Sequence, residues 1–337
     1  MNHFDLTDRE RLDLAAAAAW LATAERLLIT THVRPDGDAV GSVLSLRGLL
    51  TDLGCHCAVF FPEEPGGAHR RVLPVEHVTA DIADVHAYDA LCVLDCGNPE
   101  RVALPAGITL KAFTRVLNLD HHPDNQRYGT INAVVSATST TEALLWMARM
   151  ADWPLSRETA TALMFGLVTD CGTFRFGNTT ARTFRSAAML LEAGARYPDI
   201  VDALHFRVSA GCQRLRNILW RRATFAFDGK LAWTVLEKGD LEACGVHPQE
   251  TENIIDVIRC LDTVEVACLL QPEKDAVRFS LRSRSSAISA GRIARRLGGG
   301  GHAAAAGASV DHITVEGAVQ RLLPLVAAEL DLPVSST

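Results

Sequence analysis

An acid and two histidines, Asp120-His121-His122, end the apolar run that begins at Arg115, and Pro123 follows them directly. The run alternates like a β-strand, so its ionisable end is expected at the carboxyl edge of a sheet, where open α/β folds place their ligand sites. Three other strand-like runs also end in acids or imidazoles. Four such ends converging on one point is the arrangement that a two-metal site needs.

The first of these segments leads into a loop with a histidine and two aspartates, His32, Asp36 and Asp38. Gly37 separates the carboxylates, so both can point toward one ion. Two carboxylates this close repel each other unless a positive charge lies between them. An alternative stays open for the loop alone, in which the acids form an Asx turn and Asp38 caps the helix that follows.

Two more acids follow apolar segments. Asp95 ends the run from Ala90, and Asp170 follows the run from Leu163. A half-buried carboxylate must be paired or bound to metal to offset its desolvation. Each acid alone could be a cap or turn residue, but together they form a coherent ligand set. The predicted metal ligands are His32, Asp36, Asp38, Asp95, His121 and Asp170, with His122 beside them.

The ligand set is rich in oxygen, holds two imidazoles and has no thiolate. This donor chemistry favours Mn²⁺, with Mg²⁺ or Co²⁺ as substitutes, over a structural zinc. Six ligands are too many for one transition ion but suit two ions about 3.5–4 Å apart that share a carboxylate.

A second region indicates phosphate binding. Residues 276–310 contain six arginines and no aspartate or glutamate. Arg282 ends a predicted strand, whereas Arg295 and Arg296 fit an exposed helix face. A run of four glycines then precedes His302. Such a run lets a ligand approach backbone N–H groups closely. It does not match a P-loop, because no Gly-Lys-Ser/Thr follows. Arg282 and His302 are the expected ligand contacts.

The elements that position these residues alternate in type. Strands are predicted at 26–31, 55–61, 90–94 and 115–119 in the first half, and at 223–227, 230–237, 264–270 and 276–281 in the second. Helices are predicted at 7–25, 39–53, 139–150, 158–168, 180–192, 248–262, 288–297 and 316–329. The alternation of strands and helices in the first half predicts an α/β domain. Residues 195–222 have a helical period with mixed polarity, which indicates a helical linker. The expected domains are therefore 1–194 and 223–332.

Composition limits the class of protein. The chain has 337 residues, and its net charge of −7 argues against general electrostatic binding to nucleic acid or membranes. Nine scattered cysteines do not indicate a disulfide framework. The apolar stretch at 14–21 is too short to span a bilayer and lacks a basic region before it. A cytoplasmic protein with reduced thiols is expected.

Five motifs in this order and spacing resemble the DHH/DHHA1 phosphoesterase family. They are residues 31–42, 94–97, 118–122, 168–172 and 299–307. The resemblance covers nearly the whole chain. It implies an N-terminal catalytic DHH domain with a parallel five-stranded sheet flanked by helices. A smaller, mobile α/β DHHA1 domain with a mixed sheet would grip the substrate through the glycine-rich motif.

The resemblance also implies roles for single residues. One metal would be held by His32 and Asp36, and the second by Asp38, His121 and Asp170, with Asp95 bridging. Asp120 would support the imidazoles by hydrogen bonding, and His122 would contact the scissile phosphate or assist the leaving group. Substrate contacts would come from Arg282, Ser283, Gly299, Gly300, Gly301 and His302.

Size separates the members of this family. Without a transmembrane, sensory or extra nucleic-acid-binding segment, the chain resembles the short members. These cleave RNA di- to pentanucleotides (nanoRNA) and remove the 3′-phosphate of 3′-phosphoadenosine 5′-phosphate (pAp). The alanines after His302 replace expected polar residues, which leaves base and sugar preference open. Long duplex nucleic acid and membranes are not expected partners, and monomer or homodimer stays open.

Two rival functions remain. One is phosphodiester hydrolysis of cyclic or linear dinucleotides such as cyclic di-AMP or pApA, which the same metals would perform. The other is a non-catalytic nucleotide sensor, which could spare metal ligands, although no expected ligand is missing here.

Overall fold

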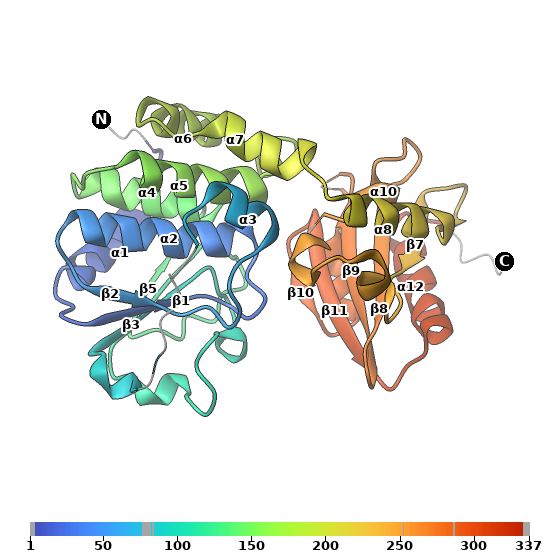
Figure 1. Ribbon diagram of the computed structural model, residues 1–337, viewed down its shortest axis with the longest axis horizontal. Coiled ribbons are helices and arrows are strands. Elements are labelled where there is room, and N and C mark those ends of the chain that lie inside the picture. The colour runs from blue at the N-terminus through green and yellow to red at the C-terminus, as the bar shows by residue number, and fades with distance from the viewer. Residues whose placement is uncertain (1–3, 76–81, 83, 252, 286, 333–337) are drawn as a thin grey trace. The chain divides into compact units, whose positions relative to one another are not determined.

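The computed structural model describes residues 4–75, 82, 84–251, 253–285 and 287–332 (Figure 1). The chain divides into two compact units, Met1–Arg207 and Val208–Thr337. The division falls inside the segment 195–222 that the sequence indicates as a connection.

The first unit is built on a parallel sheet of five strands in the order β2-β1-β3-β4-β5, which confirms the predicted fold class. Its strands are β1 (Leu27–Thr30), β2 (Cys57–Val59), β3 (Ala90–Leu94), β4 (Val116–Asp120) and β5 (Ile131–Val134). Its helices are α1 (Asp8–Leu21), α2 (Gly37–Asp52), α3 (Gly67–Val72), α4 (Thr140–Met150), α5 (Arg157–Asp170), α6 (Ala181–Glu192) and α7 (Tyr197–Val201). The three central strands are buried on both faces, as expected for a parallel sheet.

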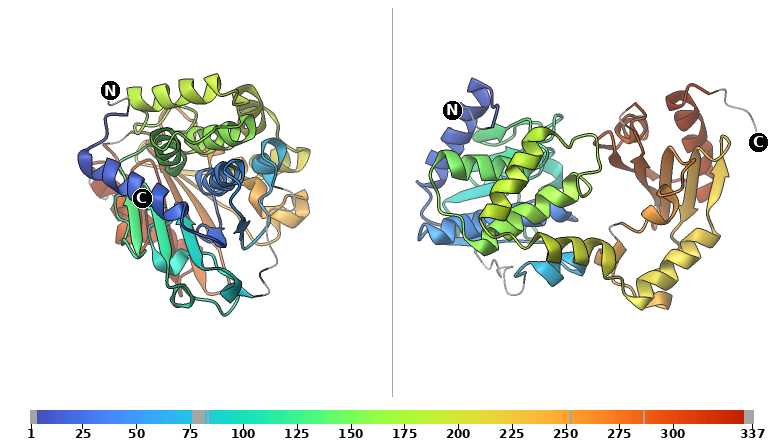
Figure 2. Two further views of the ribbon diagram at one scale, coloured as in Figure 1. Left: turned by 90° about the vertical axis from the view of Figure 1, so that its left-hand side faces the viewer. Right: turned by 90° about the horizontal axis from the view of Figure 1, so that it is seen from above.

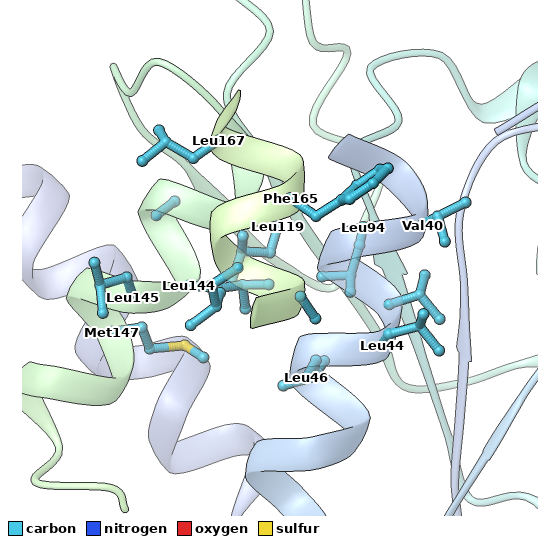
Figure 3. Packing of buried hydrophobic residues seen from close by; sticks show 14 of the residues in the cluster. Val40, Leu44, Leu46, Leu94, Leu119, Leu144, Leu145, Met147, Phe165 and Leu167 are labelled. Atoms are coloured by element: carbon cyan, nitrogen blue, oxygen red, sulfur yellow. The ribbon is translucent and has the colours of Figure 1, made fainter. Parts of the chain in front are cut away.

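Helices α2, α4 and α5 gather on one side of the strands (Figures 1 and 2). Figure 3 shows how their apolar side chains meet: Leu44 of α2, Leu144 of α4 and Phe165 of α5 lie near Leu94 and Leu119 of the sheet. On the other face, Leu28, Leu91 and Val93 belong to a separate cluster. That cluster is closed by irregular segments that include short 3₁₀ turns at Pro99–Arg101 and Leu110–Ala112.

Small residues let these helices approach closely. A Cβ atom on Gly41 of α2 would lie 2.8 Å from the carbonyl oxygen of Ala162 in α5. One on Gly166 of α5 would lie 2.4 Å from Thr141 and 2.7 Å from a carboxylate oxygen of Asp38. Both contacts are too short for real atoms, so glycine is required where α5 backs the start of α2.

The second unit carries a mixed sheet, as predicted, and its six described strands lie in the order β10-β11-β9-β8-β7-β6. Only β7 and β8 run parallel. The strands are β6 (Thr224–Ala226), β7 (Leu231–Val235), β8 (Val266–Pro272), β9 (Ala276–Ser283), β10 (Gly300–Gly301) and β11 (Ala305–Asp311). The helices are α8 (Ala210–Arg221), α9 (Asp240–Cys244), α10 (Asp256–Arg259), α11 (Ala290–Arg296) and α12 (Val315–Glu329). Two apolar clusters lie among the described residues of this unit. One includes residues of α11 and α12, and the other includes residues of α8 and α10.

Some predicted elements differ from those observed. The continuous helix expected at 248–262 is wrong, because the segment forms a 3₁₀ turn at Pro248–Thr251 and the four-residue α10. The helix expected at 39–53 begins two residues earlier, because Asp36 is its N-cap. Strands β5, β10 and β11 are not among the strands predicted from the sequence. Among the described residues, no helix is both long and apolar enough to cross a bilayer.

Candidate metal centre

The loop between β1 and α2 places three of the predicted ligands. Asp36 caps α2, since its Oδ1 accepts from the Ala39 N–H at 3.1 Å, and Asp38 lies in the first helical turn. The capping alternative therefore applies to Asp36 rather than to Asp38. His32 is buried and its Nδ1 lies 2.9 Å from the Val33 carbonyl oxygen. Its Nε2 is thereby directed toward Asp36 and Asp95, at 4.0 and 3.8 Å.

The N-terminus of α4 holds the Asp38 carboxylate. The backbone N–H groups of Thr140 and Thr141 donate to its two oxygens at 2.6 and 3.1 Å, and the Thr141 hydroxyl donates at 2.8 Å. The Thr140 hydroxyl donates to Asp95 Oδ1 at 2.9 Å. Sequence reasoning missed these two threonines. The available signal was Ser139, which caps α4 and so implies N–H groups exposed just after it.

Asp95 lies between the two histidines. Its Oδ2 faces His32 Nε2 at 3.8 Å, and its Oδ1 faces His121 Nε2 at 3.5 Å. The carboxylate is 2 % exposed. One oxygen toward each imidazole is the placement that a bridging ligand requires.

The Asp120-His121-His122 segment ends β4, as predicted. Asp120 is fully buried, and its Oδ1 accepts from the backbone N–H groups of His121 and His122 and contacts His122 Nδ1 at 2.7 Å. The support expected from Asp120 thus reaches the His122 ring directly. The His121 ring contacts the Ala137 carbonyl oxygen through Nδ1 at 3.3 Å, which directs its Nε2 toward the carboxylates.

Asp170 is the last residue of α5, so this ligand comes from a helix end instead of a strand end. Its Oδ2 lies 3.9 Å from His121 Nε2, the same distance as Asp38 Oδ2. The structure therefore brings together all six predicted ligands. They come from the β1–α2 loop, the first turn of α2, the ends of β3 and β4, and the end of α5.

The spacing of these atoms suits ions. Nitrogen–oxygen separations of 3.5–4.0 Å are too long for hydrogen bonds. Two ligand atoms about 2.1 Å from a shared ion lie roughly 3 Å apart at a right angle and roughly 4.2 Å apart on opposite sides of the ion, a range that includes these separations. His32, Asp36 and Asp95 form one group that could hold an ion, and Asp95, Asp120, His121 and His122 form another. The donor set fits divalent cations.

Electrostatics agree with this fit. Burial raises the pKa of Asp95 and of Asp170 well above the ordinary value, and the neighbouring carboxylates Asp38 and Asp36 raise both further. Burial and the charge of Asp36 likewise raise the pKa of Asp38. Crowded carboxylates of this kind are stabilised as anions only by added positive charge.

The histidines divide into two kinds. Burial lowers the pKa of His32 and of His121, which keeps both neutral, the form that binds metal. Burial would also lower the pKa of His122, but its contact with Asp120 outweighs burial and raises the value to about 10. Burial acts in the opposite sense on Asp120, whose pKa is nevertheless lowered because His122 and Asn125 contact its carboxylate.

In the second unit, the predicted substrate residues lie around the end of β9. Arg282 is half-buried and pairs across the sheet with Ala267 and Ala305. Ser283 is buried, and its hydroxyl donates to the Ala303 carbonyl oxygen at 2.7 Å. Ser283 thus ties β9 to the turn that carries His302.

The glycine run enters a hairpin. Gly300 and Gly301 form β10 and pair with Gly307 and Ala306 of β11, so His302 lies at the start of the connecting turn. A Cβ on Gly299 would lie 2.1 Å from the Gly307 carbonyl oxygen, and Gly301 has φ +129°. Two of the glycines are therefore needed for the hairpin itself.

Comparison with known proteins agrees with these features. The model of the DHH family N-terminal domain matches residues 26–167, and that of the DHHA1 domain matches residues 235–331. The bifunctional oligoribonuclease and PAP phosphatase NrnA of Thermus thermophilus is 33% identical over 306 residues, which is 90% of each chain. The protein of the same name from Bacillus subtilis is 24% identical over 295 residues, 85% of this chain and 90% of the relative.

Among solved structures, an exopolyphosphatase-related protein from Bacteroides fragilis superposes with a TM-score of 0.80. Its sequence identity is 22%, and the match covers 94% of this chain and 96% of that one, so it supports the fold alone. Together with the matching domain models and the Thermus relative, the ordered motifs show that the chain belongs to the DHH family and carries a DHHA1 domain after its DHH domain.

Proposed function

We propose that the protein is a metal-dependent phosphoesterase that hydrolyses RNA di- to pentanucleotides to mononucleotides and removes the 3′-phosphate of pAp to give AMP. The observation that carries the proposal is Asp95, whose two oxygens face His32 and His121 inside a cluster of buried carboxylates. The names of the Thermus and Bacillus relatives supply the substrate classes.

His32 and Asp36 would hold one ion, and Asp38, His121 and Asp170 the other, with Asp95 shared. The donor set favours Mn²⁺, with Mg²⁺ or Co²⁺ as substitutes. Two such ions, when bound, supply Lewis acidity and lower the pKa of a bound water so that hydroxide is available at neutral pH.

The chain's own groups do the remaining work. Asp120 holds the His122 ring through Nδ1, so Nε2 points away from Asp120 and can donate to a phosphate oxygen or to the leaving group. The N–H groups and hydroxyls at the start of α4 fix the carboxylates of Asp38 and Asp95 before substrate arrives. Fixed charges of this kind need no rearrangement during the reaction.

We assign substrate binding to Arg282, Ser283, His302 and the backbone of residues 299–301. A guanidinium can pair with two phosphate oxygens at once, which suits Arg282 to a nucleotide phosphate. The net charge of −7 is unfavourable for long strands, which need extended basic surfaces. Short substrates and a cytoplasmic location, where RNA decay produces them, fit this chemistry.

A side-by-side assay tests the proposal. Purified protein with Mn²⁺ is given pAp, a 5′-labelled RNA series from dinucleotide to pentanucleotide, a 24-mer, cyclic di-AMP and pyrophosphate. Cleavage of the short RNAs and pAp with the 24-mer spared is the expected result. Turnover of cyclic di-AMP alone would replace the proposal with a signalling phosphodiesterase. Nucleotide binding without turnover of any substrate would favour a sensor.

A further inference from the structure

Asp95 has an unusual backbone conformation. Its φ is +55°, in the left-handed region that residues with a side chain adopt rarely. The conformation turns the chain sharply at the end of β3, and it sets where the carboxylate points. Residues in such conformations persist only when their surroundings hold them there. The groups that hold Asp95 therefore bear on the metal centre.

Three side chains converge on the carbonyl oxygen of Cys96, in the peptide group between Cys96 and Gly97. The Cys96 carbonyl oxygen accepts from the Tyr128 hydroxyl at 2.8 Å and from Nδ2 of Asn118 and of Asn125 at 3.2 and 3.4 Å. Burial raises the pKa of Tyr128, so its hydroxyl keeps the proton that it donates. We call Asn118, Asn125 and Tyr128 the Cys96 clamp. A carbonyl oxygen has two lone pairs, so three donors leave this peptide little freedom to rotate.

The clamp also joins the two strand ends that carry the site. Asn125 Nδ2 donates to Asp120 Oδ2 at 2.5 Å as well as to the Cys96 carbonyl oxygen. The Gln126 N–H donates to the Gly97 carbonyl oxygen at 2.9 Å. These hydrogen bonds thus join the turn after Asp95 to the segment that follows His122.

The surroundings of Asn118 indicate that the clamp does not exist to stabilise the fold. It lies in the middle of β4, is 0 % exposed, and has apolar neighbours on both sides in the strand. Its Oδ1 has no hydrogen-bond partner among the described residues. A buried, unpaired amide oxygen destabilises a fold, and a leucine of similar size would not carry that cost. Local arrangements that cost stability in this way are expected mainly at functional sites.

We propose that the Cys96 clamp is a positioning device that holds Asp95 in its left-handed conformation, so that one carboxylate can serve both metal positions. The inference rests on the proposed metal centre and adds the residues that preorganise it. None of the three clamp residues is itself a ligand. Their loss should weaken metal binding while the sheet stays intact.

The first test is Tyr128→Phe, which removes one hydroxyl and keeps the ring. Mn²⁺ binding to the metal-free full chain is measured by calorimetry, and folding by the thermal midpoint. The expected result is a Kd for Mn²⁺ raised about tenfold, the lower end of the cost of losing a partner behind a ligand. Tyr88→Phe is the matched control. Tyr88 packs against the same apolar cluster, and in the described chain its hydroxyl makes no hydrogen bond to residues 95–97.

The second variant, Asn118→Leu, separates positioning from folding. We expect weaker Mn²⁺ binding with an unchanged or higher thermal midpoint, a combination that a merely structural residue does not give. Binding like the wild type in both variants would overturn the clamp. The clamp would also be overturned if Mn²⁺ binding weakened only in variants whose thermal midpoint had fallen. If the wild type itself binds no Mn²⁺, the proposed function fails instead, which distinguishes the two failures.

Discussion

The carboxylates of the first unit and the arginine-rich segment of the second unit differ in how firmly the chain holds them. Asp38 accepts three hydrogen bonds from the start of α4, and Asp95 is fixed by Thr140 and by its backbone turn. Arg282 is only half-buried, and one N–H of its guanidinium donates to the neighbouring Leu281 carbonyl oxygen at 3.1 Å. The first region is preorganised for ions of fixed geometry. In the proposed function, the half-buried Arg282 of the second unit adjusts to the phosphate of the substrate.

Asp95→Ala should have the largest effect, because it removes the carboxylate shared by both metal positions. Hydrolysis of pAp should fall by more than about 100-fold, which is the cost of losing only a partner behind a ligand. Circular dichroism should show a folded chain. Asp52→Ala, an exposed acid at the far end of α2, is the control for charge and should keep full activity. Near-normal turnover by Asp95→Ala would remove the proposed centre.

Arg282→Ala tests whether the second unit binds substrate without affecting metal binding in the first. The loss of a charge-assisted hydrogen bond should raise KM for pAp about 10- to 100-fold. The affinity for Mn²⁺ should not change, because all the proposed metal ligands belong to the first unit. Arg295→Ala, on an exposed face of α11, serves as the matched control. If Arg282→Ala lowered metal affinity instead, the separation of roles between the units would be wrong.

Thr140→Val tests how much preorganisation contributes within the first unit. The variant keeps the backbone N–H that binds Asp38 but loses the hydroxyl on Asp95. Mn²⁺ affinity should fall about tenfold. Thr140→Ser restores a hydroxyl and should recover most of that affinity. Equal affinities for the valine and serine variants would show that the hydroxyl does not orient Asp95.

Much of this centre could be predicted from the sequence, because acids and histidines after apolar runs stand out. Thr140, Asn118 and Tyr128 could not, since each is an ordinary polar residue whose importance depends on which atom it meets across the fold. Strand β11 was missed because alanine, glycine and serine have low strand propensity. Residues 248–262 have a helical pattern, but among those that the structure describes only the four of α10 form an α-helix. Local pattern predicts the elements that carry the ligands better than the contacts that orient them.

The smallest expected effect separates stability of the first unit from its chemistry. Glu10 accepts from the Thr7 and Ser136 N–H groups, which ties the start of α1 to the residues after β5. Burial would raise the pKa of Glu10, but these hydrogen bonds outweigh burial and lower it. A lowered pKa stabilises the fold above the ordinary value near 4.5, and the contribution disappears as pH falls through the folded-state value.

Glu10→Gln should therefore lower the free energy of unfolding by about 1 kcal/mol at pH 7, as for other capping interactions. The difference from the wild type should shrink below pH 4.5 in urea titrations, while activity at pH 7 stays unchanged. A difference that grows on acidification would mean that the carboxylate is not favoured in the folded state.

The most direct test of the central claim is the number of Mn²⁺ ions that each chain binds, measured by equilibrium dialysis and elemental analysis. We expect two ions per wild-type chain and loss of tight binding at both positions in Asp95→Ala, because each proposed position uses one oxygen of that carboxylate. A wild-type chain that binds none, or an Asp95→Ala chain that still binds two with equal affinity, would contradict a two-metal centre built around Asp95.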